Sequence, residues 1–389
     1  TQFVHLYVKD NTEESGGKFE DYGIYTQVEQ LNKTALKSHG LDSNGQLYKI
    51  NSFEFYRYED IIKKEDDAGY DKTAFEKMLE IKGDSDHTKL IDMLTDLNDY
   101  SIGIEDVLKE HFDEENIVYW MAFQILMGNV DTQNRNVYLY SPLNSDIWYF
   151  IAWDNDGCLM RSEYELKNFS DQGSWEKGIS NYWGNVLFQR CLKSRSFREK
   201  LNDAILELRE YLNKDMLTSK IEGYKNVLKP YLYSMPDAEY EPLTSEQYDQ
   251  IVASLPDEIE KNYKLYLESL ETPMPFYIGI PTIDGNKLKF NWDVSYDLDA
   301  EDITYSVEVA RDYLFQDVIY HNTTLTVPEA EMDLPEAGQY FVRVRATNTS
   351  GKTQDAFDYY VTDEGKHYGM KCFYITEDST VEEDDYEEG

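Results

Sequence analysis

The spacing of apolar positions changes twice along the chain, and each change predicts a different architecture. In the first part, the Phe, His and Tyr side chains at residues 3, 5 and 7 alternate with the aliphatic ones at residues 4, 6 and 8, and further strand-like runs follow at Tyr22–Val28 and Gln46–Ile50. Alternation with a period of two is typical of strands. From residue 51 to about residue 270, apolar residues recur mainly every three or four positions, which predicts helices. We therefore expect a small β-rich unit followed by a mainly helical one.

A third pattern begins after the Pro-containing stretch Glu271–Pro275, which indicates a linker. Alternating runs separated by turn residues then predict strands at residues 287–292, 304–310, 339–346 and 357–361. Trp292 falls on an early strand, and Tyr340 falls near the start of the long one. A tyrosine at that place can hydrogen-bond to upstream backbone, as in the tyrosine corner of Ig-like sandwiches. Residues 273–364 therefore resemble a fibronectin type III domain.

The most informative stretch joins a helix to two strands. An apolar run over Ile117–Met127 leads into a polar loop that contains Asp131 and Asn136. A strand pair follows, and its second strand ends at Trp153, directly before Asp154 and Asp156. We expect the loop and the strand end to bring their carboxylates to one site.

These residue types fit phosphoryl transfer, which needs a carboxylate near the attacking hydroxyl, oxygen ligands for a divalent metal, and a cation on the phosphates. Asp131 fits the first role, and the five-residue spacing to Asn136 is that of a kinase catalytic loop. Asn136, Asp154 and Asp156 are the candidate ligands for Mg²⁺ or Mn²⁺. Lys49 is the candidate cation.

Ordinary structural roles compete with this interpretation. Asp and Asn are common turn residues, so Asp131 could simply close a loop and Asp154 could cap a helix. The combination of spacing, strand pair and strand-end acid favours the functional interpretation.

Composition excludes several classes of partner. The chain has 389 residues, with 37 Lys and Arg against 76 Asp and Glu, and its net charge is −39. We expect no nucleic-acid partner because phosphate contacts need clustered cations. An aromatic content of 14% is too high for a disordered chain. No apolar run approaches the roughly 18 residues of a membrane span, so we expect none.

The cysteines and the first residue bear on the compartment. Cys158, Cys191 and Cys372 are too few for a disulfide framework and fit no zinc spacing, so buried free thiols are favoured over one bridged pair. The chain begins at Thr1 without Met or an apolar leader. We interpret this as a trimmed or mature chain whose signal peptide has been removed.

Residues 1 to about 270 resemble the CotH kinase family, the atypical kinases related to spore coat protein H. The segments that carry the resemblance occur in family-like order and spacing: Phe3–Val8, Tyr22–Glu29, Gly45–Lys49, Gly128–Asp131 with Asn136–Tyr140, and Ile151–Asp156. The resemblance implies a two-lobed kinase-like fold, ATP with magnesium or manganese, and phosphorylation of Ser or Thr on protein substrates. It also implies a bacterial protein that is extracellular or on the cell surface.

The resemblance assigns roles to single residues as well. Asp131 becomes the catalytic aspartate and Asp154 the metal-binding aspartate, while Glu29 becomes the partner of the nucleotide-binding Lys49. The family's opening strands would lie before Thr1. After Asp156 the chain reads Gly-Cys-Leu, where the family usually has a small residue and an aromatic–Gly turn.

We thus expect an α+β chain with a kinase-like domain over residues 1–272. Its small β-rich N-lobe covers about residues 1–58 and lacks its first strands, and its mainly helical C-lobe covers residues 59–272. An all-β fibronectin-like sandwich follows at 273–364, and an acidic tail at 365–389.

Three functional hypotheses follow. The first is a protein Ser/Thr kinase. The second is a catalytically inactive kinase-like scaffold of a surface assembly, bound to its partner through the fibronectin-like domain. The third and weakest is a calcium-stabilised adhesion protein, since Asp154-Asn155-Asp156 places oxygen ligands at alternate positions but no complete calcium loop follows.

Overall fold

The computed structural model describes residues 1–10, 12, 17–167 and 172–383. The chain divides into two units. Unit one contains Thr1–Lys167 and Glu199–Lys261, and unit two contains Asn168–Arg198 and Asn262–Gly389. The division passes through two long helices, so it does not coincide with the boundary expected at residue 272.

Unit one is built on a four-stranded antiparallel sheet in the order β4-β3-β5-β6. These strands are β3 (Gln46–Ile50), β4 (Leu79–Ile81), β5 (Val137–Ser141) and β6 (Tyr149–Ala152). Tyr48, Leu139 and Phe150 stand opposite one another in the register and are buried, so one face of the sheet meets the core. On the other face, Leu47 and Tyr140 pack with Leu36.

The strands of the first 58 residues do not form one sheet. β1 (Gln2–Lys9) and β2 (Phe19–Gln27) form a separate two-stranded hairpin, whereas β3 pairs with β5. The hairpin lies against α9 (Lys214–Leu232), where the Phe3 ring meets Tyr224. The period of two in the sequence predicts each strand but carries no information about its partner.

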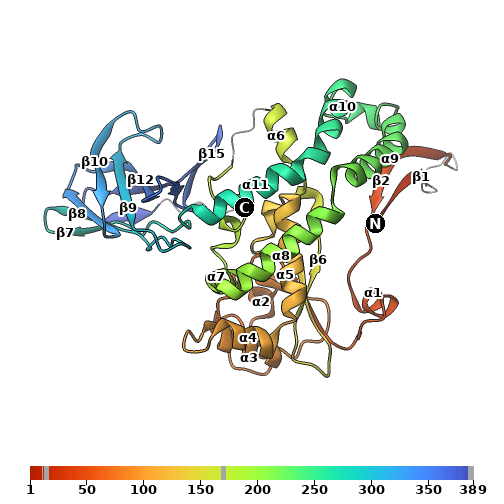
Figure 1. Ribbon diagram of the computed structural model, residues 1–389, viewed down its shortest axis with the longest axis horizontal. Helices are drawn as coiled ribbons and strands as arrows, with labels where there is room; N and C mark the ends of the chain where they lie inside the picture. Colours follow the sequence, from red (N-terminus) through yellow and green to blue (C-terminus); the bar gives the residue numbers. More distant parts are fainter. Residues whose placement is uncertain (11, 13–16, 168–171, 384–389) are drawn as a thin grey trace. The chain divides into compact units, whose positions relative to one another are not determined.

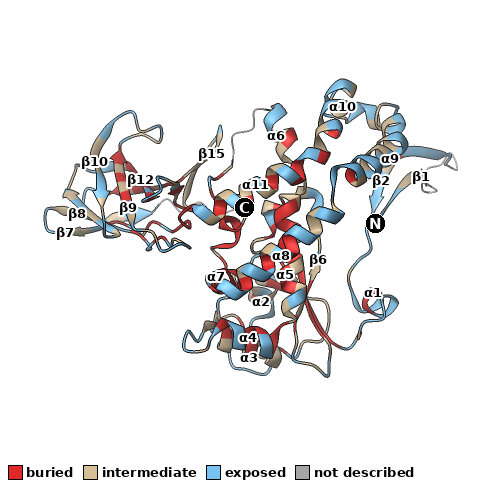
Figure 2. Ribbon diagram, in the orientation of Figure 1, coloured by how far each residue is buried: buried red, intermediate tan, exposed pale blue. Residues whose placement is uncertain are grey.

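The helices expected before the polar loop are present. They are α1 (Lys33–Ser38), α2 (Lys72–Met78), α3 (Thr88–Asn98), α4 (Ile104–His111) and α5 (Glu114–Met127). α5 is buried on nearly all sides, as its red ribbon in Figure 2 shows, because its apolar residues surround the axis. The helix α2 ends at Met78, because the next three residues form β4 and pair with β3.

The helical region continues after the strand pair. It consists of η2 (Asn155–Gly157), α6 (Arg161–Lys167), η3 (Ser180–Tyr182), α7 (Val186–Lys193), α8 (Arg195–Tyr211), α9, η4 (Asp237–Glu239), α10 (Ser245–Ser254), η5 (Leu255–Asp257) and α11 (Glu258–Glu271) (Figure 1). No described helix is long and apolar enough to cross a membrane.

The described part of unit two contains two antiparallel sheets whose inner faces share one core, together with a separate two-stranded hairpin, β14-β15. The first has the order β11-β8-β7, and the second the order β10-β9-β12-β16-β17, with β13 also paired to β12. The strands are β7 (Thr282–Asp284), β8 (Lys287–Asn291), β9 (Ile303–Ala310), β10 (Val318–Leu325), β11 (Glu329–Asp333), β12 (Gly338–Asn348), β13 (Thr353–Asp355), β14 (Tyr359–Thr362), β15 (Gly365–Tyr368), β16 (Met370–Ile375) and β17 (Val381–Glu383). Phe290, Val309 and Val342 are among the buried residues of that core.

The strands extend beyond the boundary expected at residue 364. β16 pairs with β12, and Phe373 is completely buried in the shared core, so residues 365–383 belong to the fold rather than to an acidic tail. The remaining residues of the expected tail, 384–389, lie outside the described residues. The three cysteines are free thiols, as expected.

A tyrosine hydroxyl closes the turn before the longest strand. The Tyr340 hydroxyl donates a hydrogen bond of 2.8 Å to the Glu336 carbonyl, and the ring lies in the core between the sheets. This is the local geometry that the sequence predicts for a tyrosine corner.

Replacing Tyr340→Phe should therefore lower the free energy of unfolding by about 1 kcal/mol, because one largely buried hydrogen bond is lost while the ring remains. Urea unfolding of the full chain measures this loss. Tyr320→Phe is the matched control, since its ring packs on the same core and no hydrogen bond from its hydroxyl is found among the described residues. Equal stability of the two variants would contradict the role of the Tyr340 hydroxyl.

Candidate active site

The end of α5 fixes the position of the polar loop. The helix ends at Gly128, whose φ of 65° is left-handed and therefore favours glycine. Asn129 then caps the short helix η1 (Val130–Thr132), because its side-chain oxygen accepts the Asp131 N–H at 3.3 Å. The sequence thus places Asp131 shortly after a buried helix, on a backbone that is fixed by the helix end at Gly128 and by the Asn129 cap.

Asp131 and Asn136 meet directly, as their spacing predicts. The Asn136 side-chain amide donates to the Asp131 carboxylate at 2.7 Å and to the Asp131 carbonyl at 3.2 Å. Asn136 achieves this with a φ of 57°, a left-handed conformation that Asn tolerates. The Arg135 guanidinium lies 3.6 Å from the same carboxylate, whose side chain is half-exposed.

The turn that follows β6 lies beside this loop. Asp154, two residues after the end of β6, has a left-handed conformation (φ 54°) and leads into η2. Gly157 is so close to the loop that a Cβ on it would lie 2.9 Å from the Asn129 side-chain oxygen and 3.9 Å from the Asp131 Cβ. The Leu159 N–H also donates to the Met127 carbonyl at 2.8 Å. The two halves of the predicted site are therefore neighbours.

A set of three amides links these two halves. Gln124 on α5 is completely buried and donates to the Asn155 side-chain oxygen at 3.0 Å. Asn129, also buried, donates to the Gln124 oxygen at 3.1 Å and lies 3.4 Å from the Asn155 oxygen. We call Gln124, Asn129 and Asn155 the amide link. Sequence reasoning missed its role, although the polar Gln124 inside an apolar helix was a signal that could have revealed it.

Burial and neighbouring carboxylates raise the pKa of both Asp131 and Asp154. Burial is the largest cause of the raised pKa of Asp131; the charges of Asp154 and Asp156 add to it, while Arg135 and Asn136 oppose it. Burial likewise raises the pKa of Asp154, the Asp156 charge raises it further, and the Lys49 charge lowers it. The site thus concentrates negative charge that the described side chains only partly balance.

The structure separates the expected partners Lys49 and Glu29. The Glu29 carboxylate accepts hydrogen bonds from His39 at 2.7 Å and from Ser38 at 3.4 Å. Lys49 lies on β3 directly opposite Glu80 on β4. An ion pair between Lys49 and Glu29 is not found among the described residues, whereas the effect of Lys49 on Asp154 shows that its charge reaches the site. Strand register, which the sequence does not reveal, places Glu80 opposite Lys49, but the Glu80 carboxylate is paired with Lys82 at 2.5 Å.

A further glutamate anchors the polar loop to the sheet region. Glu54 accepts a hydrogen bond from the Asn134 side chain at 2.7 Å and another from the Tyr58 hydroxyl at 2.6 Å. The Phe53 N–H donates to the Asn134 carbonyl at 2.8 Å. The loop between Asp131 and Asn136 is consequently fixed from outside as well as by its own side chains.

The candidate metal ligands are all oxygens, as hard divalent cations prefer. Asp154, Asp156 and Asn136 supply two carboxylates and one amide, and the carboxylate charge that helps raise the pKa of Asp131 and Asp154 is one that a cation would offset. No three His, Cys, Asp or Glu side chains in the described part of the chain are already arranged to hold a metal ion. The donor chemistry fits Mg²⁺ or Mn²⁺, but the phosphates of a nucleotide would have to complete the coordination.

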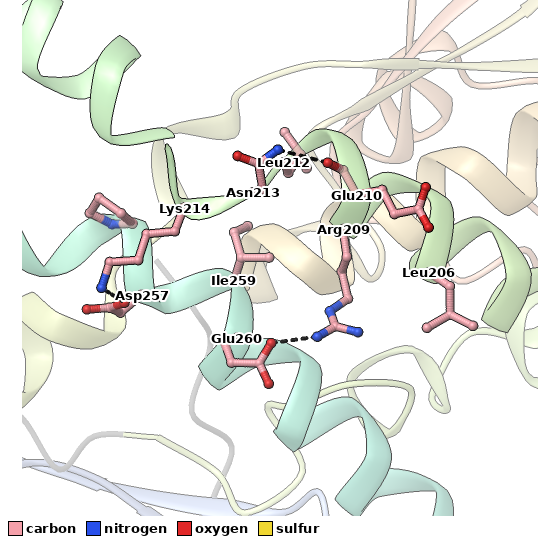
Figure 3. Close-up of a pocket in the computed structure, with 10 residues that line it drawn as sticks. Leu206, Arg209, Glu210, Leu212, Asn213, Lys214, Asp257, Ile259 and Glu260 are labelled. Carbon is pink, nitrogen blue, oxygen red and sulfur yellow. Dashed lines mark hydrogen bonds and ion pairs between the residues drawn. The ribbon is translucent and has the colours of Figure 1, made fainter. Parts of the chain in front are cut away.

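A large hollow of unit one lies among other residues. It has a volume of about 620 Å³ and lies between the end of α8, the start of α9, and η5 with α11. Figure 3 shows its two cations already paired, Arg209 with Glu260 at 2.6 Å and Lys214 with Asp257 at 2.5 Å. None of the predicted site residues lines it.

The amide link predicts a specific coupling between the two halves of the site. Asn129→Ala should lower the free energy of unfolding by about 1–3 kcal/mol, because the buried Gln124 oxygen loses its donor. Amide hydrogen exchange should accelerate at both Asp131 and Asn155. Asn51→Ala is the control, since it removes another partly buried side-chain hydrogen bond, to the Glu76 carbonyl. If exchange at Asp131 and Asn155 does not change in Asn129→Ala, the link does not couple the two segments.

Comparison with known proteins adds one strong match. The family described as CotH kinase protein matches residues 1–266. No protein with a curated description matches the chain. Among solved structures, the surface layer protein SbsC, domains 1–6, is similar at 12% identity and a TM-score of 0.15, over 85% of this chain and 41% of that chain. This chain therefore spans well under half of that structure's length, and a likeness so weak carries no argument. The family match, by contrast, covers more than half of the sequence, and the chain belongs to the CotH kinase family.

Proposed function

We propose that this protein transfers the γ-phosphoryl group of ATP, with Mg²⁺ or Mn²⁺, to Ser or Thr side chains of protein substrates. The observation that carries the proposal is the meeting of the Asp131–Asn136 loop with the Asp154 turn across the amide link. Family membership supports kinase-like chemistry in general. The proposal adds the substrate class, the cofactors and the role of each residue.

Asp131 orients the acceptor hydroxyl and takes up its proton. Its half-exposed side chain is accessible, and the bond from Asn136 fixes one carboxylate oxygen while the other faces Arg135. A carboxylate with a raised pKa is a better proton acceptor than an ordinary one. Lys49 provides positive charge for the phosphates from the neighbouring strand.

The divalent cation would neutralise the phosphate charge and bridge it to the protein. Asp154 and Asn136 are the residues to hold it, with Asp156 as a further oxygen ligand. Their side chains fit this role in chemistry and location. The nucleotide-binding role of Glu29 becomes indirect, because its carboxylate is occupied by His39 and Ser38.

We also propose that the β-rich part of unit two is a fibronectin type III-like module. Its sheet orders β11-β8-β7 and β10-β9-β12-β16, its hydrogen bond from Tyr340, and its buried Trp292 support this assignment. Modules of this kind usually act as spacers or binding domains. A bacterial surface or extracellular location and a surface-assembly partner are part of the same proposal, as is the two-lobed description of the kinase-like region.

A catalytically inactive scaffold is the second candidate function. It is favoured by one observation, that no preformed metal cluster is found among the described side chains. The two functions differ in whether the site residues are needed for activity. A scaffold would still bind its partner when Asp131, Asn136 and Asp154 are replaced, whereas a kinase would lose its activity.

Incubating the full chain with γ-labelled ATP, Mn²⁺ or Mg²⁺, and Ser-rich peptides tests the kinase activity. Asp131→Asn should reduce labelling by at least about 100-fold, the usual contribution of a positioned proton acceptor. Asp60→Asn, an exposed aspartate on another loop, should leave labelling unchanged. If the wild-type protein labels neither itself nor any peptide, the proposed kinase activity is refuted. Full activity in Asp131→Asn would refute the role assigned to that residue.

Asp154→Asn should separate catalysis from stability. A carboxyl whose pKa is raised on folding stabilises the fold at low pH and loses that contribution as pH rises through the raised value. At pH 7 the substitution therefore removes a repulsion, and Asn also tolerates the left-handed backbone. We expect the apoprotein Tm to rise by roughly 1–2 °C while the Tm increase caused by Mn²⁺ with ATP disappears. A Mn²⁺–ATP response equal to that of wild type would exclude Asp154 as a ligand.

A further inference from the structure

A groove in unit one runs along the outer edge of the strand that delivers Asp154. Its volume is about 550 Å³, and it lies between α5 and β6, which are both labelled in Figure 1. Three aromatic residues line it: Trp120 and Phe150 are almost fully buried, and Phe123 is partly exposed. The groove reaches Ala152, two residues before Asp154. It is thus distinct from the carboxylate site but adjoins it in sequence.

The edge of β6 is closed along most of its length and open at its end. The Trp148 N–H donates to the His111 carbonyl at 2.7 Å, and the Asn116 side chain accepts from the Phe150 N–H at 2.6 Å while donating to its carbonyl at 3.1 Å. Because backbone groups alternate in direction along a strand, those of Ala152 also point outward. In the described part of the chain we find no hydrogen-bond partner for them.

The position of Ala152 agrees with an open edge. It stands opposite Val137 in the register, on the same side of the sheet as the buried Phe150, yet Ala152 is exposed. The groove is the reason for this exposure, because α5 covers Phe150 but leaves the end of the strand uncovered.

The charged side chains that line the groove are all acidic among the described residues. Asp113 and Glu115 line it, and no Lys or Arg does so among the described lining residues. Asp113 accepts the Asn116 N–H at the start of α5. Glu115 is exposed, and no ion pair of its carboxylate is found in the described residues. The other large hollow differs, since its carboxylates are matched by Arg209 and Lys214.

We propose that this groove docks an extended segment of the substrate protein that carries basic and apolar side chains. The apolar side chains pack on Trp120 and Phe123, the basic ones face Asp113 and Glu115, and the backbone pairs with the open edge at Ala152. Strand addition of this kind supplies affinity through the backbone and specificity through alternate side chains. The negative net charge of the chain adds attraction for a basic partner.

The inference rests on the proposed kinase function for its consequence, because a segment docked at Ala152 is held beside the turn that carries Asp154. Residues that follow the docked segment are then presented to Asp131 at high effective concentration. Docking would therefore lower the KM for acceptors joined to such a segment and leave kcat nearly unchanged.

Binding to the full chain without nucleotide tests the groove itself. The probes are three fluorescein-labelled twelve-residue peptides: one with alternating Lys/Arg and Leu, one with Glu in place of the basic residues, and one with Ser in place of Leu. The first should bind, and both changes should weaken it. Glu115→Lys should weaken the first peptide by about tenfold, whereas Glu210→Lys, the same charge change at the other hollow, should alter it less than about twofold.

Phe123→Ala is the second variant, since it removes the apolar contact without changing charge; its fold is checked by thermal unfolding. Equal binding by wild type and Glu115→Lys, equal losses in Glu115→Lys and Glu210→Lys, or no binding of the first peptide would each overturn the docking groove. A Ser-containing extension of the first peptide, assayed with ATP and Mn²⁺, separates the two proposals. Binding without phosphorylation refutes the kinase function and leaves the groove standing.

Discussion

The amide link holds the site together, because it is the contact between the buried core and both carboxylate segments. Gln124 and Asn129 are almost inaccessible to water, so their hydrogen bonds to each other and to Asn155 are costly to break. Through them, a largely buried helix sets the positions of a loop and a turn whose carboxylates are more exposed. Gly157 permits this close approach, since any side chain there would strike Asn129.

The same arrangement concentrates charge that the fold does not neutralise. The charges of Asp154 and Asp156 help raise the pKa of Asp131, and the Asp156 charge helps raise that of Asp154, while Arg135 and Lys49 offset only part of the repulsion. Such a concentration is unfavourable for folding and favourable for binding a divalent cation with phosphates. The site resembles other functional sites in this respect, where local stability is lost in return for binding.

Local features of the fold could be predicted from the sequence, and features that depend on strand partners could not. The five-residue spacing brings Asn136 to Asp131. Asn32 caps α1, because its side-chain oxygen accepts hydrogen bonds from the first backbone N–H groups of the helix. Glu80 could not be recognised as the neighbour of Lys49, because strand register places it there. β16 was missed for a different reason: Met370–Ile375 has no acidic residue and is itself strand-like, but the domain boundary expected at residue 364 assigned it to the tail.

The most direct test of the account is a crystal structure of the full chain with Mn²⁺ and a non-hydrolysable ATP analogue. The account predicts an anomalous Mn²⁺ signal bound by the Asp154 carboxylate and the Asn136 amide oxygen, with the terminal phosphate facing Asp131. A nucleotide bound elsewhere, with no Mn²⁺ at Asp154, would contradict it.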